Sequence, residues 1–534
     1  MSRPISLSRH RCLFLSALAW LLACLPGFAA TLPSGFVETP IGSGWTEVVG
    51  LTFAADGRMY AWERGGKVWI VEHGVKASTP FIDLSEEVGG WRDFGLLGFC
   101  LHPNFYTNGY VYLFYMVDHH HAKYFGTPDY NPATDEYFMA TISRCTRYTA
   151  RASDGFRSVD PASRKILLGE TITNGIPSVH QSHGSGSVLF GTDGTLLLSC
   201  GDGASYSSAD TGSASETYWQ QALSDGIIRP AENVGAFRAQ MVNSLNGKIL
   251  RLDPETGDGV PSNPFYDPAF PRSPKSRVWA MGLRNPCRVK LRPGTGSTNP
   301  ADANPGVIYI GDVGWRTWES MRVCTGPGQN FGWPVFEGLE VQSAYHNANV
   351  GNQDAPNPLF GTGGCTQQYF YFRDLIVQET LGTPSWPNAC DATKQVPANI
   401  PHFVHHRPVM DWKHDTGPAR TGIFSGTNAA VVTVGAAGSP VTGASFPGNC
   451  SIAGIWYTNT DVPAPYRNLY YHADYGEGWI KMLNFDTNNR PLSIQDFATG
   501  CGGLVFVTSD PVNGGLYYIP WTASIMQVRY GQAG

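Results

Sequence analysis

The segment from His180 to Gly203 contains the residues whose types and spacing best suit chemistry. It reads HQSHGSGSVLFGTDGTLLLSCGDG, with His180 and His183 before one apolar run, a turn at Asp193-Gly194, and Asp202 after a second run. An imidazole can take up a proton near neutral pH, and a nearby carboxylate can orient the ring and stabilise the cation. On residue types alone, capping a turn is the more ordinary role for such a histidine. The segment predicts a hairpin with a candidate base and its carboxylate at the two ends.

This hairpin is one of six similar units, each with an apolar strand, a tight turn and a second apolar strand rich in aromatic residues. Asp56-Gly57 and Asn108-Gly109 mark turns of the first two units. The units contain the segments VVGLTFAADGRMYAWE, GLLGFCLHPNFYTNGYVYLFYM, the opening hairpin with NGKILRL, VWAMGLRNPCRVKL with GVIYIGDVGWRTWESMRV, AGIWYTNTD through LYYHADYGEGWIKMLNF, and LVFVTSDPVNGGLYYIPW. Six such units predict an all-β fold, a six-bladed β-propeller, because each blade buries its apolar faces on its neighbours and the closed ring leaves only short edges.

Composition supports many short strands over long helices. The chain has 62 Gly, 38 Pro and 24 Tyr, and only 15% of its residues are charged. Three long inter-blade insertions are expected, at residues 118–137, 204–240 and 342–401. Loops of this length on a propeller usually build the walls of a binding face, although their polar composition is also compatible with disordered decoration. The three histidines of DHHHAKY are expected in a solvated loop and not in a metal site, because neighbours in an extended loop point in different directions.

The first thirty residues resemble a secretory signal peptide. Arg3, Arg9 and Arg11 precede the apolar run CLFLSALAWLLACLPGF, and small residues follow it. We therefore expect residues 1–30 to be a signal peptide, residues 31–534 to form the propeller, and the mature protein to be secreted or periplasmic. Lipoprotein processing before Cys24 is an alternative. No later segment is long and apolar enough to be a transmembrane segment.

Charge and cysteine content restrict the function further. There are 43 Asp and Glu against 37 Lys and Arg, and loss of the leader makes this balance more acidic, which argues against a nucleic acid or an anionic membrane as partner. No Cys-x-x-Cys occurs among the 11 cysteines, so neither a zinc ribbon nor a covalently attached haem is expected. Cys365 and Cys390 flank an irregular loop and are the preferred disulfide pair. Cys100 and Cys200 lie in apolar runs and are expected as buried thiols.

Four motifs in the same order resemble those of a known family. GLLGFCLHPNF, HGSGSVLFGTDGTLLLSCGDG, GLRNP, and GDVGWRTWE followed by NFGWP are similar to segments of the soluble sugar dehydrogenases that depend on pyrroloquinoline quinone (PQQ), the glucose/sorbosone dehydrogenase family. The resemblance runs from about Gly35 to the C-terminus. It implies oxidation of an aldose at C1 to the lactone, with hydride passed to the quinone and electrons then passed to a separate acceptor. The same domain also resembles the propellers of Hedgehog-interacting-type proteins, whose role is binding.

The resemblance implies roles for particular residues. His183 matches the base that takes the proton of the C1 hydroxyl, and Asp202 matches the carboxylate that supports it. Arg284 and Asn285 of GLRNP match the pair that contacts the reactive carbonyl side of PQQ. His180 has no counterpart and is expected to be a loop histidine.

A calcium ion is also implied by the resemblance. The backbone carbonyls of Val313 and Gly314 match its ligands, and calcium prefers such hard oxygen donors. Asp312 and Glu319 lie close by in the sequence. They either supply charge to the site or cap turns.

The chain departs from the family in its charges. Asp93 stands where glucose-oxidising members have a glutamine, so a carboxylate would face the tricarboxylate cofactor. No basic residue stands where the family has a lysine in blade five and an Arg-x-Arg in blade six, and Arg420 and Lys413 are the candidates to compensate. These losses predict weakened PQQ binding. They leave open an exported, non-catalytic propeller that binds a protein or glycan, and a dehydrogenase for another alcohol.

Overall fold

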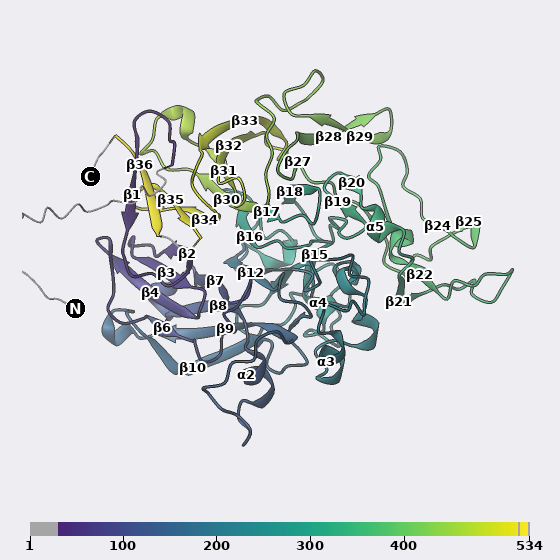
Figure 1. Ribbon diagram of the computed structural model, residues 1–534, viewed down its shortest axis with the longest axis horizontal. Coiled ribbons are helices and arrows are strands. Elements are labelled where there is room, and N and C mark those ends of the chain that lie inside the picture. The colour runs from purple at the N-terminus through teal and green to yellow at the C-terminus, as the bar shows by residue number, and fades with distance from the viewer. Residues whose placement is uncertain (1–29, 522–523, 532–534) are drawn as a thin grey trace, which may run out of the picture.

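The protein is a six-bladed β-propeller, as the repeated units predict. The computed structural model describes residues 30–521 and 524–531, and six antiparallel sheets are arranged around a central axis (Figure 1). The expected signal peptide lies almost entirely outside the described residues. No helix in the described part of the chain is long and apolar enough to cross a membrane.

Each blade begins with an inner strand beside the axis and adds strands outward. Blade 1 consists of β2 (Val48–Phe53), β3 (Met59–Glu63), β4 (Lys67–Glu72) and β5 (Val75–Lys76), with β6 (Ile82–Asp83) also on β4. Blade 2 consists of β7 (Leu96–Leu101), β8 (Tyr110–Met116), β9 (Thr141–Ala150) and β10 (Val159–Leu168), with β11 (Ile176–Ser178) also on β9. Blade 3 consists of β12 (Ser185–Phe190), β13 (Leu196–Cys200), β14 (Lys248–Leu252) and β15 (Val278–Met281).

The remaining blades follow the same plan. Blade 4 has six strands, β16 (Arg288–Leu291), β17 (Ile308–Asp312), β18 (Trp318–Cys324), β27 (Met410–Lys413), β28 (Ala419–Ser425) and β29 (Asn428–Thr433). Blade 5 consists of β30 (Ser451–Tyr457), β31 (Leu469–Asp474), β32 (Ile480–Phe485) and β33 (Pro491–Ala498). Blade 6 consists of β34 (Leu504–Ser509), β35 (Leu516–Pro520) and β36 (Ile525–Tyr530), completed by β1 (Phe36–Ile41).

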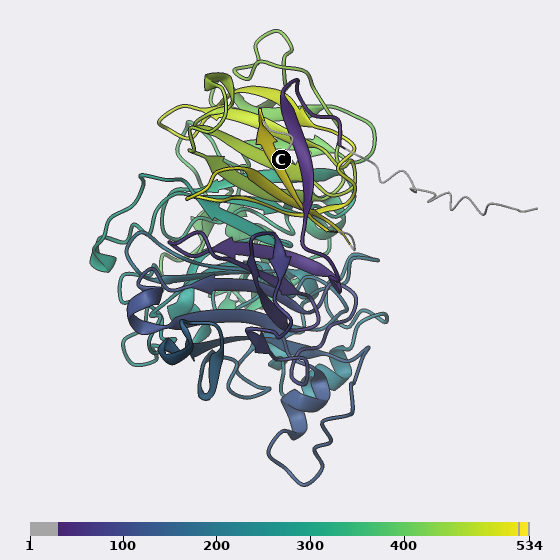
Figure 2. The ribbon, with the colours of Figure 1, turned by 90° about the vertical axis from the view of Figure 1, so that its left-hand side faces the viewer.

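The first described strand closes the ring. β1 pairs antiparallel with β36, from Phe36 opposite Tyr530 to Ile41 opposite Ile525, and Figure 2 shows this purple strand among the yellow strands of the last blade. A strand from one end of the chain therefore completes the blade at the other end. This pairing fastens the two ends of the described chain together and closes the ring.

One boundary between the predicted units is wrong. The segment VWAM was assigned to the fourth unit, but it forms β15, which pairs with β14 as the outer strand of blade 3. Blade 4 begins at β16, after GLRNP. The error arose because the long segment between β13 and β14 separates the two halves of blade 3 in the sequence.

The three insertions lie within blades and not between them as expected, since each joins two strands of one sheet. The first connects β8 to β9 and carries α2 (His119–Tyr124), and the second connects β13 to β14 and carries α3 (Trp219–Ser224). The third connects β18 to β27 and carries α5 (Ser343–His346) and the short strands β21 (Gly351–Pro356), β22 (Tyr369–Tyr371), β23 (Ile376–Val377), β24 (Pro387–Asn388) and β25 (Asp391–Gln395). Each of the three thus contains regular secondary structure.

The prediction of a solvated histidine loop is wrong. His119, His120 and His121 lie on α2 and are only 2%, 7% and 5% exposed. The insertion folds back on the molecule, so His119 lies between the carboxylates of Glu136 and Asp225. No group of three or more side chains suited to a metal ion occurs among the residues that the structure describes.

The predicted disulfide between Cys365 and Cys390 is confirmed. It joins two parts of the third insertion. Cys200 is fully buried, as expected, whereas Cys100 is only half-buried because it lies on β7 beside the central channel.

Candidate functional site

The site lies on the propeller axis. The six inner strands are arranged around the propeller axis (Figure 1). Their N-terminal ends line a cavity of about 300 Å³, which we call the upper cavity. Its lining combines every inner strand with the loops above them: Val49, Arg64, Arg92, Asp93, Leu97, His183, Gly184, Ser185, Asn285, Cys287, Arg288, Val313, Cys450, Ile452, Tyr475, Val505 and Trp521. Side chains from all six blades therefore meet in one place.

His183 lies in the wall of the upper cavity, and a hydrogen bond to Asp202 orients its ring. Its Nδ1 donates to Oδ1 of Asp202 at 2.8 Å. This leaves Nε2 as the nitrogen that can accept a proton, and no hydrogen bond to Nε2 is present among the described residues. The backbone of His183 has φ of 61°, in the left-handed region that non-glycine residues seldom adopt. Such a conformation often occurs where a side chain must be aimed at a functional site.

Asp202 is completely buried, and its carboxylate is fully engaged. Besides His183, it accepts hydrogen bonds from Nε1 of Trp333 at 2.7 Å and from the backbone N–H of Ala204 at 2.9 Å. Burial alone would raise the pKa of Asp202, but the imidazole of His183, and then Arg284, outweigh it and hold this pKa below its usual value. The carboxylate is therefore ionised at neutral pH and can stabilise a positive charge on His183.

Trp333 is a residue that reasoning from the sequence missed. It follows β18 in the NFGWP segment and is 2% exposed. Its indole reaches Asp202 from a different blade, a contact that requires the complete fold. The NFGWP motif indicated the segment, but nothing in it indicated the contact with Asp202.

Arg284 and Asn285 lie in the loop between β15 and β16. Their backbone N–H groups donate to Oδ1 of Asp312 at 3.0 and 2.9 Å, which fixes this turn. The side chain of Asn285 lines the upper cavity. Nε of Arg284 is buried without a partner among the described residues.

The Arg284 guanidinium contacts the carbonyls that the resemblance assigns to calcium. Its Nη1 donates to the carbonyl oxygens of Val313 at 3.1 Å and Gly314 at 2.6 Å. Calcium binds oxygen at about 2.3–2.6 Å, so the ion and this guanidinium cannot use the same carbonyl together. With Arg284 in this position, the two residues do not fit a calcium ion.

Asp312 and Glu319 cap turns. Asp312 also accepts from Nε of Arg322 at 2.8 Å. Glu319 accepts from the N–H groups of Gly314 and Ser451 and from His414. The oxygens of both carboxylates are occupied by these hydrogen bonds, so neither Asp312 nor Glu319 would serve as a calcium ligand.

Three further arginines, which no sequence motif indicated, line the upper cavity. Arg64 follows β3, Arg92 precedes Asp93, and Arg288 begins β16. Arg64 is paired with Glu47 at 2.7 Å, whereas Arg92 is exposed and forms no ion pair in the described part of the chain. These cations come from blades 1, 2 and 4, not from blades 5 and 6 where the family pattern has them.

Asp93 faces the cavity and has no hydrogen-bond partner in the described structure. Although its side chain is open to the cavity, protein surrounds the cavity on most sides. This desolvation raises the pKa of Asp93. The positive charges of His183, Arg284 and Arg64 act to lower the same pKa, but desolvation outweighs them. The expected departure from the family thus places a carboxyl group beside the candidate base.

The structure does not bring Arg420 or Lys413 to the cavity. Arg420 lies on β28, four strands outward from β16, which is roughly 19 Å at the spacing of adjacent strands. Its guanidinium pairs with Asp411 at 2.8 Å and with Glu340. Lys413 is exposed on β27. His180 is a buried loop histidine whose ring packs edge-on against Tyr206.

The family model for glucose/sorbosone dehydrogenases matches residues 45–362, more than half of the chain. The chain belongs to this family. Quinoprotein glucose dehydrogenase B of Acinetobacter calcoaceticus is 26% identical over 60% of this chain and 57% of its own length. The HIPL1 protein of Arabidopsis thaliana is 25% identical over 64% of this chain and 50% of its own length. The human Hedgehog-interacting protein is 27% identical over 54% of this chain and 36% of its own length.

Solved structures support the fold. The soluble aldose sugar dehydrogenase of Escherichia coli superimposes with a TM-score of 0.51 at 15% identity, covering 93% of this chain and 99% of that one. Another structure, of a glucose dehydrogenase, gives a TM-score of 0.53 at 16% identity, with 93% and 100% covered. The chain spans about half the length of the curated relatives it matches first. Family membership and these structures therefore establish the glucose/sorbosone dehydrogenase-type propeller.

Proposed function

We propose that this protein is a PQQ-dependent dehydrogenase that oxidises an aldose at C1 to the lactone. The observation that carries the proposal is the His183 Nδ1 to Asp202 hydrogen bond of 2.8 Å in the wall of an axial cavity that three arginines line. A base, its orienting carboxylate and a cationic slot are the groups that hydride transfer from an alcohol to an anionic quinone requires. Electrons would leave through a separate acceptor.

His183 and Asp202 provide proton transfer in this proposal. Nε2 of His183 takes the proton of the C1 hydroxyl as the C1–H bond breaks. Asp202 keeps the Nδ1–H tautomer in place and stabilises the imidazolium that forms. Trp333 and the N–H of Ala204 hold Asp202, so the pair is oriented before substrate binds.

The upper cavity fits a flat tricarboxylate. When bound, the quinone supplies the two-electron acceptor for the hydride. Arg64, Arg92 and Arg288 would hold its carboxylates, and Asn285 would donate to a carbonyl oxygen. Arg284, next to Asn285, adds positive charge at that end. These arginines take the place of the lysine and the Arg-x-Arg that the chain lacks.

No step of the proposed mechanism depends on calcium. Arg284 uses the carbonyls of Val313 and Gly314 in this structure, and a divalent ion would have to displace it. The positive charge that polarises the quinone in our proposal is that of the guanidinium. We also propose that the protein works outside the cytoplasm, since the Cys365–Cys390 disulfide persists best in an oxidising compartment.

Reconstitution with PQQ tests the proposal. The purified protein is titrated with PQQ, and dye reduction is followed with a panel of aldoses. We expect quinone binding and aldose-dependent reduction, and we expect His183→Ala to bind quinone but lose at least about a hundredfold in rate. The matched control is His73→Asn, because His73 is exposed on the turn between β4 and β5 and has a similar positive φ. Absence of both quinone binding and dye reduction in the unmodified protein would overturn the proposal.

The second candidate is a non-catalytic propeller that binds a protein or glycan. The similarity to the Hedgehog-interacting protein favours it. In that case the upper cavity would bind neither PQQ nor an aldose. The same titration separates the two functions.

A further inference from the structure

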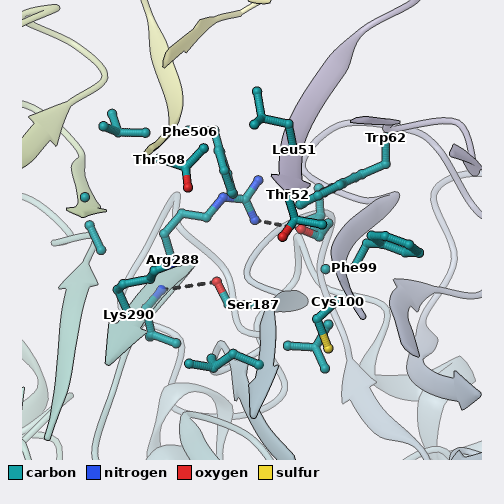
Figure 3. A pocket seen from close by; sticks show the side chains of 18 residues that line it. Leu51, Thr52, Trp62, Phe99, Cys100, Ser187, Arg288, Lys290, Phe506 and Thr508 are labelled. Carbon is teal, nitrogen blue, oxygen red and sulfur yellow. Dashed lines mark hydrogen bonds between the residues drawn. The ribbon is translucent and has the colours of Figure 1, made fainter. Parts of the chain in front are cut away.

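The central channel continues below the upper cavity. A second cavity of about 120 Å³, which we call the lower cavity, is lined by the C-terminal parts of the same six inner strands (Figure 3). Arg288 is the one polar side chain that lines both cavities. The lower cavity has no role in the proposed dehydrogenase.

Arg288 forms the partition between the two cavities. It starts from blade 4, and its guanidinium donates to the carbonyl oxygens of Val49 at 2.8 Å, Leu97 at 2.8 Å and Val505 at 3.2 Å, which belong to blades 1, 2 and 6. Figure 3 shows the side chain reaching across the channel. Arg288 is 7% exposed, and none of its partners among the described residues is a carboxylate. A positive charge therefore stands on the axis without a counter-charge.

Lys290 adds a second positive charge below Arg288. The two residues are two positions apart on β16, so their side chains leave the same face of the strand. Lys290 lines the lower cavity and makes no hydrogen bond or ion pair in the described part of the chain. Burial lowers the pKa of its amine, which means that the cavity solvates the charge poorly.

The other lining residues carry no negative charge. No Asp or Glu lines the lower cavity. The polar side chains besides the two cations are the hydroxyls of Thr52, Ser187 and Thr508, the Cys100 thiol and the Trp62 indole. The hydroxyls of the two threonines have no hydrogen-bond partner among the described residues, and neither does Nε1 of Trp62. The remaining walls are mainly apolar, with Leu51, Phe99 and Phe506 among them. In such a setting an uncompensated charge is costly, and a counter-ion is bound more strongly than in water.

We infer that the lower cavity binds a small inorganic anion of halide size. Two cations and two free hydroxyl donors meet there with no competing carboxylate, and the small volume excludes a quinone or a sugar. The anion would neutralise Lys290 and accept hydrogen bonds from Thr52 and Thr508. This site shares Arg288 with the proposed quinone site, but Lys290 and the two threonines line the lower cavity alone, so its test requires neither quinone nor sugar.

Thermal unfolding at constant ionic strength tests the inference. Sodium bromide or chloride is compared with sodium gluconate, whose anion is too large for the cavity. We expect a halide to raise the unfolding midpoint by about 2–3 °C at a hundredfold excess over its Kd. In Lys290→Met this halide effect is lost, and the variant is at least as stable as the unmodified protein in gluconate, because the unpaired charge is gone. Lys165→Met is the matched control, since Lys165 is exposed on β10, and it should keep the halide effect.

Crystals soaked in iodide give a second, independent measurement. We expect one anomalous peak on the axis between Lys290 and the two threonines, and no peak in Lys290→Met. A lower cavity that contains water only, or a halide effect that persists in Lys290→Met, would overturn the inference. If Lys290→Met does not fold, the presence or absence of the peak in the unmodified protein decides.

Discussion

Nδ1 of His183 donates to Asp202 at 2.8 Å, and this bond ties the two ends of the β12–β13 hairpin together at the wall of the upper cavity. The hairpin places the two residues side by side because β12 and β13 run antiparallel, with Ser185 opposite Cys200. Asp202 is buried and ionised, and His183 faces the cavity. The local geometry thus separates the roles of the two residues, one orienting and the other reacting.

Asp202→Asn should lower the rate of aldose oxidation by about a hundredfold to ten-thousandfold while quinone affinity changes little. An amide in this place cannot stabilise an imidazolium and can favour the wrong tautomer of His183. The measurement is single-turnover reduction of bound quinone, together with a quinone titration. Trp333→Phe should give a smaller loss, since it removes only one of the three hydrogen bonds to Asp202. Equal losses of rate and quinone affinity in Asp202→Asn would contradict the orienting role.

Asp93→Gln should tighten quinone binding by about tenfold. The carboxylate of Asp93 faces a cavity that would hold a tricarboxylate, and one poorly solvated like-charge contact costs about 1 kcal/mol or more. Because desolvation by the surrounding protein raises the pKa of Asp93, a fall in pH protonates it earlier than an ordinary aspartate, and quinone affinity should rise as the pH falls. In Asp93→Gln this part of the pH dependence should be absent. The exposed Asp354→Asn variant, measured by the same fluorescence titration, should leave both properties unchanged.

Quinone binding by the unmodified protein should need no added calcium. Arg284 contacts the carbonyls of Val313 and Gly314, so its charge already stands where the ion would act. Isothermal titration in EDTA and in calcium should give affinities within about twofold. Arg284→Ala frees both carbonyls and should bind quinone weakly in EDTA, with partial recovery in calcium. A strong calcium requirement in the unmodified protein would show that Arg284 moves away when the cofactor binds.

Some of this site is predictable from the sequence because its parts are local. His183 and Asp202 flank a single hairpin, and Arg284 and Asn285 are neighbours in one turn, so a motif identifies each pair together. The cavity-lining residues Arg64, Arg92 and Arg288 belong to three blades, and only ring closure brings them together. Arg420 shows the reverse case, since position in the sequence suggested the site but β28 lies far from the axis. The buried histidines of α2 were missed for the same reason, because Glu136 and Asp225 reach His119 through a fold-back that no local pattern indicates.

Asp225 links two of the insertions above the blades and should make their stability depend on pH. Its carboxylate accepts hydrogen bonds from Nε2 of His119 at 2.9 Å, Nε2 of Gln221 at 2.6 Å and Nζ of Lys123 at 2.8 Å, so it joins α2 to α3. Burial acts to raise the pKa of Asp225, but these donors outweigh it and lower the pKa to about 2.

A carboxyl group whose pKa is lower in the folded state stabilises the protein above its ordinary pKa of 3.8, and this contribution is lost as the pH falls towards about 2. Asp225→Asn should therefore reduce the free energy of unfolding by about 2 kcal/mol at pH 6. Below pH 4, the difference in this free energy between the variant and the unmodified protein should become smaller as the pH falls. Urea unfolding from pH 6 to pH 3, followed by hydrogen exchange of the α2 and α3 amides, measures this difference. Asp129→Asn is the control, because Asp129 is exposed in the same insertion and should show no such trend. A constant difference across the whole pH range would mean that packing, and not the ionised carboxylate, holds the two insertions together.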